Sequence, residues 1–154
     1  MPEGNLLREE RAAISVLSAV SLAVVIGIAS LAVEYGHGLL QRSDNQRVAD
    51  LAAYGGALVY NSTYNSTAGN TGAAMSAATR AATNIAALNG FTSSNASVTP
   101  AIVPRGDGNL AIQVTVTTNL PMYLAEVLIA SPTLPVTATA YAEMTGASTV
   151  ALVQ

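Results

Sequence analysis

The chain contains no cysteine, no tryptophan and no lysine, and it has one phenylalanine (Phe91) and one histidine (His37) among 154 residues. Without cysteine there is neither a disulfide nor a thiolate metal ligand. A metal cluster or a Ser/His/Asp triad would depend on His37, which lies just beyond an apolar segment and has no second His or Cys to work with. The sequence therefore predicts no cofactor, no metal site and no enzymatic activity.

Charged side chains are also scarce, at 10% of the chain, and the formal net charge is −3. The six basic residues are all arginines, spread between Arg8 and Arg105, so they predict no basic surface for nucleic acid. Asp107 lies in a Gly-Asp-Gly turn, but one carboxylate supplies too few ligands for calcium. We expect neither nucleic acid nor a small-molecule substrate as a partner.

What the sequence does contain is an uncharged apolar run of 22 residues from Ala12 to Val33. A helix of this length and composition spans the hydrocarbon core of a bilayer. The alternatives are a cleaved secretory signal, whose apolar region is shorter at roughly 7–15 residues, and a buried helix of a soluble protein. The run therefore predicts a transmembrane helix at 12–33, with the membrane itself as a partner.

The orientation of this helix depends on weaker signals. Arg8 and Arg11 precede the run, and Arg42 and Arg47 follow it closely, so the positive-inside rule is nearly balanced. The preceding tail has only 11 residues and is the easier side to retain. We therefore predict a short cytoplasmic tail at 1–11 and export of the remainder.

Helical periodicity continues beyond the run, which predicts a helix extension over 34–60. A continuous rod from Ala12 to Tyr60 would be on the order of 70 Å long, and Gly36 and Gly38 mark the expected bend. The expected apolar stripe of the extension comprises Val48, Leu51, Ala52, Gly55, Leu58 and Val59.

Composition predicts a loop over 61–71. A second helix is predicted from Thr71, its expected N-cap, to Leu88, before the stop signal Asn89-Gly90. Its predicted apolar face comprises Ala74, Ala78, Ala81, Ile85 and Leu88.

Alternating apolar and polar residues predict strands over 110–117 and 136–144. The segment 98–103 is predicted as a further strand, joined to 110–117 by a hairpin turn at 105–109. A short amphipathic helix is expected between Leu120 and Leu128, and 149–153 is either a terminal strand or a hydrophobic tail. The fold class is therefore α+β: a long N-terminal transmembrane helix, a second helix and an antiparallel sheet of about three or four strands, with 72–154 as the exported domain.

Three N-terminal features resemble the TadE/TadG-like family, the membrane-anchored pseudopilin-type proteins of bacterial Flp (Tad) pilus systems. They are Arg11-Ala12-Ala13 before the run, Glu34-Tyr35-Gly36 after it and the Ala-rich block 49–57. The turn 120–124 and the strand end 138–142 are similar to the TadE-like domain. The resemblance implies a pilin-like small domain in the bacterial inner membrane, facing the periplasm or the exterior, with incorporation into a surface filament as a further option. It also implies a homo- or hetero-oligomer with other pilin-like or Tad machinery subunits.

One position departs from the pattern of processed family members, which carry a glutamate five residues after the cleavage point. The aligned residue here is Leu17, so we predict that the amino terminus is not cleaved. The spacing from Gly4 to Glu9 is the alternative match, for cleavage after Gly4.

The small residues of the apolar run suit close contact between helices. The candidate packing and assembly residues are Ala19, Ala23, Gly27, Ser30 and Glu34. For Glu34 two roles stay open, a solvated residue at the membrane interface or a partner for Arg42 or for an arginine of a neighbouring subunit. The predicted function is a structural or assembly subunit; the alternatives are a filament-forming major subunit and a membrane-anchored periplasmic binding or sensor module.

Overall fold

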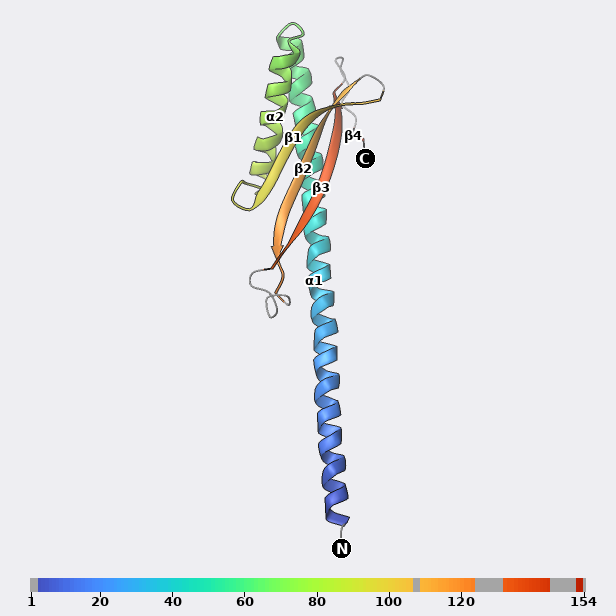
Figure 1. Ribbon diagram of the computed structural model, residues 1–154. Coiled ribbons are helices and arrows are strands. Elements are labelled where there is room, and N and C mark those ends of the chain that lie inside the picture. Colours follow the sequence, from blue (N-terminus) through green and yellow to red (C-terminus); the bar gives the residue numbers. More distant parts are fainter. Residues whose placement is uncertain (1–2, 107–108, 124–131, 145–151, 154) are drawn as a thin grey trace.

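The computed structural model describes residues 3–106, 109–123, 132–144 and 152–153, with side chains described from residue 13 up to 144. The first element is a single helix, α1 (Glu3–Ser66), whose 64 residues correspond to about 96 Å of axial length. Figure 1 shows that the second helix and the sheet lie beside the C-terminal half of α1 only, so that the N-terminal half projects away from the domain.

Helix α1 is longer and straighter than the sequence predicts. It continues without interruption through Gly36 and Gly38, so the expected bend is wrong; neither glycine has a positive φ, and no proline interrupts the helix there. It also continues past Tyr60, so most of the loop predicted over 61–71 is helical. Tyr60 is buried and stacks on Tyr64 with ring centroids 5.9 Å apart, and this contact extends the helical conformation through a polar sequence.

The turn between the two helices is therefore short. Ala68 and Gly69 have positive φ angles of 51° and 87°, which reverse the chain, and the backbone N–H of Gly69 donates to the carbonyl of Tyr64. The N-cap of the second helix, α2 (Thr71–Leu88), is Asn70 and not Thr71, because the Asn70 side chain accepts a hydrogen bond from the N–H of Ala73. The predicted C-terminal stop at Asn89-Gly90 is confirmed.

Helix α2 packs against α1 through alanines. The buried row on α2 is spaced by four residues and comprises Ala74, Ala78, Ala82 and Ala86. Of the predicted face, Ala74 and Ala78 are confirmed and Ala81 and Ile85 are half-buried, but Leu88 is 86% exposed. The row shifts because small side chains let the two backbones approach closely, so the alanines occupy the interface and the larger residues lie beside it.

The sheet is a meander in the order β1-β2-β3-β4, with all neighbours antiparallel. Its strands are β1 (Ala96–Pro104), β2 (Leu110–Pro121), β3 (Thr133–Met144) and the two-residue β4 (Leu152–Val153). The three predicted strands, their hairpin and the α+β class are confirmed. The predicted helix over 120–128 is wrong at its start, since Leu120 and Pro121 continue β2; its other residues from 124 on lie outside the described residues. Of the uncertain segment 149–153, the structure describes only β4.

One face of the sheet lies against the helices. Ile112, Val114 and Val116 of β2 are buried there and pair with the small residues Ala142, Ala140 and Ala138 of β3. The opposite face is polar: Gln113, Thr115 and Thr117 form side-chain hydrogen bonds with Tyr141, Thr139 and Thr137 across the same strand pair, at 2.7–3.1 Å. The core therefore lies between α1, α2 and one face of the sheet.

Candidate functional site

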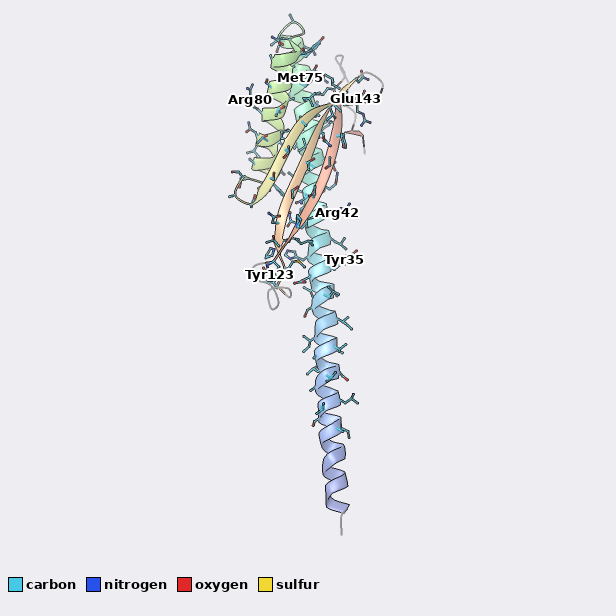
Figure 2. All side chains as sticks on the ribbon, in the orientation of Figure 1. Tyr35, Arg42, Met75, Arg80, Tyr123 and Glu143 are labelled. Carbon is cyan, nitrogen blue, oxygen red and sulfur yellow. The ribbon has the colours of Figure 1, made fainter. Side chains whose placement is uncertain are left out.

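The N-terminal half of α1 exposes large apolar side chains on all sides, as Figure 2 shows. The large apolar residues between Ile14 and Leu40 are between 51% and 72% exposed, which exceeds what a helix at the surface of a soluble domain shows. Among the described residues, α1 is the one helix that is long and apolar enough to cross a membrane. This projecting half of α1 contains all five candidate assembly residues.

The five candidates lie on one side of α1. Because a helix turns by about 100° per residue, positions 19, 23, 27, 30 and 34 fall within roughly a quarter of its circumference. Ala19, Ala23 and Gly27 are exposed, whereas Ser30 and Glu34 are half-buried near the end of the sheet. We call this set the small-residue stripe. The stripe lies on the side of α1 that the sheet covers farther along the helix, just before the domain begins.

The stripe is open to another chain. A Cβ atom added at Gly27 would meet no described atom within 4 Å, so this position is not occupied by the chain's own fold. The hydroxyl of Ser30 donates to the carbonyl of Ile26 at 2.8 Å, which satisfies its hydrogen bond within the helix. Ser30 is thus compatible with apolar surroundings.

A second exposed row lies on α1 within the domain, and it corrects the predicted stripe. Of the residues predicted to share one face, Val48 and Ala52 are buried, but Leu51 and Leu58 are exposed, as is Tyr54 between them. The sheet and α2 cover an adjacent sector that includes Ala49 and Ala53 and leave this row outside. Leu51, Tyr54 and Leu58 are spaced by three and four residues, as in a helix seam that packs on another helix.

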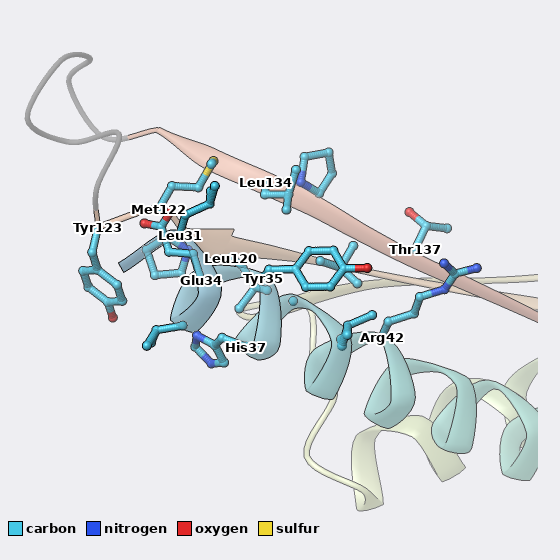
Figure 3. A pocket seen from close by; sticks show the side chains of 16 residues that line it. Leu31, Glu34, Tyr35, His37, Arg42, Leu120, Met122, Tyr123, Leu134 and Thr137 are labelled. Atoms are coloured by element: carbon cyan, nitrogen blue, oxygen red, sulfur yellow. The ribbon is translucent and has the colours of Figure 1, made fainter. Parts of the chain in front are cut away.

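A cavity of about 480 Å³ separates α1 from the lower end of β2 and β3. Figure 3 shows side chains of both parts around it. They are Leu31, Glu34, Tyr35, His37 and Arg42 from α1, Leu120, Leu134 and Thr137 from the two strands, and Met122 and Tyr123 just beyond the end of β2. Its lining is mostly apolar, with Glu34, His37 and Arg42 as its acidic and basic side chains. Sequence analysis missed this cavity because it is formed by segments about 90 residues apart.

A buried polar cluster fixes α1 to the sheet just beyond the cavity. The side-chain amide of Asn45 is fully buried and donates to Thr118 Oγ1 at 3.0 Å and to the carbonyl of Val136 at 2.8 Å. Its carbonyl oxygen accepts from the amide of Gln41 at 3.0 Å. A polar residue on the packed face of α1 is the signal that would have identified this position. Since these bonds are directional, they fix how α1 lies along β2 and β3.

The electrostatics of the site are weak. Asp44 and Arg47 form an exposed ion pair at 4.0 Å, which contributes little to stability. Burial, together with the nearby Tyr64, raises the pKa of Tyr60 above its ordinary value. In the part of the chain that the structure describes, no three His, Asp or Glu side chains gather closely enough to hold a metal ion. Asp107 lies outside the described residues.

Comparisons with family models, curated proteins and solved structures give no match for this chain.

Proposed function

We propose that this protein is a membrane-anchored structural subunit that assembles laterally through α1. The observation that carries the proposal is the exposure of the projecting half of α1, where the large apolar side chains from Ile14 to Leu40 are 51–72% exposed. Such a surface requires a bilayer or other protein chains around it. The uncharged run 12–33 has the length that a bilayer core needs, and the α+β domain follows it on one side.

The small-residue stripe is the proposed contact between subunits. In a bilayer, helices associate by close packing at small residues and not by hydrophobic burial. Ala19, Ala23 and Gly27 offer such a surface. The Leu51–Tyr54–Leu58 row lies on a different side of α1, about 100° around the helix, and offers a separate contact within the domain.

The resemblance to TadE/TadG-like proteins supports a Tad (Flp) pilus system as the setting. In that setting the protein is an assembly component or minor pilin in the bacterial inner membrane, and its domain faces the periplasm or the exterior. A filament-forming major subunit would use the same helix surface in many copies. The number of copies in the native assembly separates these two forms of the proposal.

An anchored binding or sensor module is the second candidate, and the cavity between α1 and the lower end of β2 and β3 is the observation that favours it. Its volume is within the range of about 300–1,000 Å³ that small-molecule sites occupy. Its mostly apolar lining offers few of the convergent polar groups that such sites use for specificity. Retention of a polar small molecule by the purified protein would favour this candidate over assembly.

Gly27→Leu tests the lateral-assembly proposal, with Val25→Leu as its matched control. Both changes keep the run uncharged, but Val25 lies on roughly the opposite side of the helix from the stripe. Because the chain's own described atoms leave Gly27 open, leucine is tolerated in the single chain and blocks only a partner helix. We expect normal carbonate-resistant membrane insertion for both variants, and loss of chemically cross-linked oligomers for Gly27→Leu alone.

Two other outcomes would count against the proposal in different ways. Equal cross-linking of both variants would remove the small-residue stripe as the contact. Release of the intact wild-type chain by carbonate would remove the membrane anchor.

A further inference from the structure

The lower end of β2 and β3 is an uncharged apolar surface. The described residues there, 119–123 and 132–137, include no charged side chain. Tyr123 is 66% exposed and Leu134 is 46% exposed, and Pro121 and Pro135 are exposed beside them. An exposed strand end of this composition is unusual in water, where loop ends carry polar and charged residues. We call these residues the β2–β3 end.

The β2–β3 end lies level with the last turn of the uncharged run. Met122 and Tyr123 line the same cavity as Leu31, and Figure 3 shows Met122 close to Leu31. Leu31 is two residues, or about 3 Å along the axis, from the end of the run at Val33. If the run spans the hydrocarbon core, the β2–β3 end must therefore lie at the bilayer surface.

The arrangement of α1 and the sheet makes this depth rigid. Asn45 fixes α1 to Thr118 and Val136 just above the cavity, and α1 continues through this region without a bend. The domain therefore has no hinge there by which the β2–β3 end would lift away from the membrane. Tyr35 on α1 and Tyr123 on the strand end also lie where interfacial tyrosines are typically found.

We propose that the β2–β3 end is a second membrane contact, which lies in the headgroup region of the bilayer and leaves the cavity beside α1 to be filled by lipid. The partner is a lipid surface, and this inference rests on the proposed membrane anchor. Because the described residues of the β2–β3 end carry no charge, the contact depends on apolar and aromatic insertion and not on anionic lipid. Its role is to hold the domain at one orientation relative to the membrane, so that neighbouring subunits meet in register.

The experiment uses the full chain with single cysteines, which the cysteine-free sequence permits without background. An environment-sensitive fluorophore is attached at Leu134→Cys, at Val25→Cys within the run, or at Asn65→Cys in the last turn of α1. Each variant is placed in phosphatidylcholine vesicles at a low ratio of protein to lipid. The vesicles contain lipids brominated either near the headgroup or near the bilayer centre, which quench fluorescence at different depths.

We expect the probe at position 134 to be quenched best by the shallow bromines. The probe at position 25 lies about 12 Å inside the run and should be quenched best by the deep bromines. The probe at position 65, at the far end of the domain, should not be quenched. Adding anionic lipid to the vesicles should leave the quenching at position 134 unchanged.

The outcomes separate this inference from the proposed function. Quenching at position 25 without quenching at position 134 would overturn the second contact and keep the anchor. Absence of quenching at position 25 would overturn the anchor, and the second contact with it. Protection of position 134 from both bromines and an aqueous quencher would mean that a second copy covers the β2–β3 end, which would also overturn the lipid contact.

A second variant tests the contact without a probe at its centre. Leu134→Asp adds a charge at an exposed position, so the fold should be preserved, as circular dichroism checks. With the fluorophore at Tyr123→Cys, this charge should lower quenching by the shallow bromines, because the rigid unit of α1 and the sheet must tilt or rise to return Asp to water, whereas Leu134→Ile should retain the quenching. Equal quenching of the two variants would contradict insertion of the β2–β3 end.

Discussion

Gly56 lies at the closest approach of α1, α2 and the sheet, and its replacement by alanine tests how tightly they pack. A Cβ atom at this position would lie 2.7 Å from Cδ1 of Ile112, 3.1 Å from the carbonyl oxygen of Ala78 and 3.4 Å from Cβ of Ala82. The end of the Ile112 side chain can rotate away. The carbonyl of Ala78 belongs to the backbone of α2, so the two helices must separate to make room for the methyl group.

The size of the effect follows from two opposing contributions. Overpacking of a tight interface costs about 1–3 kcal/mol of unfolding free energy. Alanine in place of glycine returns up to about 1 kcal/mol through helix propensity. We therefore expect Gly56→Ala to lower the free energy of unfolding by up to about 2 kcal/mol, with a fall in Tm of about 2–4 °C for each kcal/mol.

Gly72→Ala is the matched control, because an added Cβ there meets only Asn70 Oδ1 at an ordinary 3.6 Å. This variant should gain stability from helix propensity alone. Urea unfolding of the full chain in detergent, followed by circular dichroism, measures both variants. The difference between them isolates the overpacking cost. If Gly56→Ala were as stable as Gly72→Ala, the argument that α1 and α2 pack at backbone contact distance would be refuted.

Two further predictions concern the domain. Asn45→Leu should lower the free energy of unfolding by about 1–3 kcal/mol, because it leaves the buried carbonyl of Val136 and the hydroxyl of Thr118 without their donor. In a Thr118→Val background the same change should cost less. If urea unfolding shows that the effects of the two substitutions add fully, the shared hydrogen bond is contradicted. The raised pKa of Tyr60 means that the folded chain holds this proton more tightly than the unfolded chain, so the contribution of Tyr60 to stability should be constant up to about pH 10 and fall above it. Tyr60→Phe should reduce that alkaline slope, and an identical slope in both proteins would rule out this residue as its cause.

Local patterns were enough to predict most elements of the fold. The strands alternate with a period of two, so β1, β2 and β3 and their antiparallel pairing followed from Ile112, Val114 and their neighbours without tertiary information. The stop of α2 at Asn89-Gly90 is equally local, since glycine there adopts a φ of +87° at no steric cost. The uncharged run was visible for the same reason, because length and lack of charge are properties of a contiguous segment.

Other features depend on contacts between distant segments. The exposure of Leu51 and Leu58 was decided by which sector of α1 the sheet and α2 cover. On an alanine-rich helix several faces are apolar enough to be buried, so periodicity alone does not choose among them.

The sequence by itself therefore determined the long apolar helix, the second helix, the strands and the small residues at Ala19, Ala23 and Gly27. Only the tertiary structure decided that Asn45 joins α1 to β2 and β3, and that the uncharged β2–β3 end lies beside Leu31 around one cavity. The physical reason is the separation along the sequence of the residues that form each feature. A helix or strand pattern repeats within a few residues, whereas these contacts join residues separated by 73 to 91 positions, and they depend on how the packed elements meet.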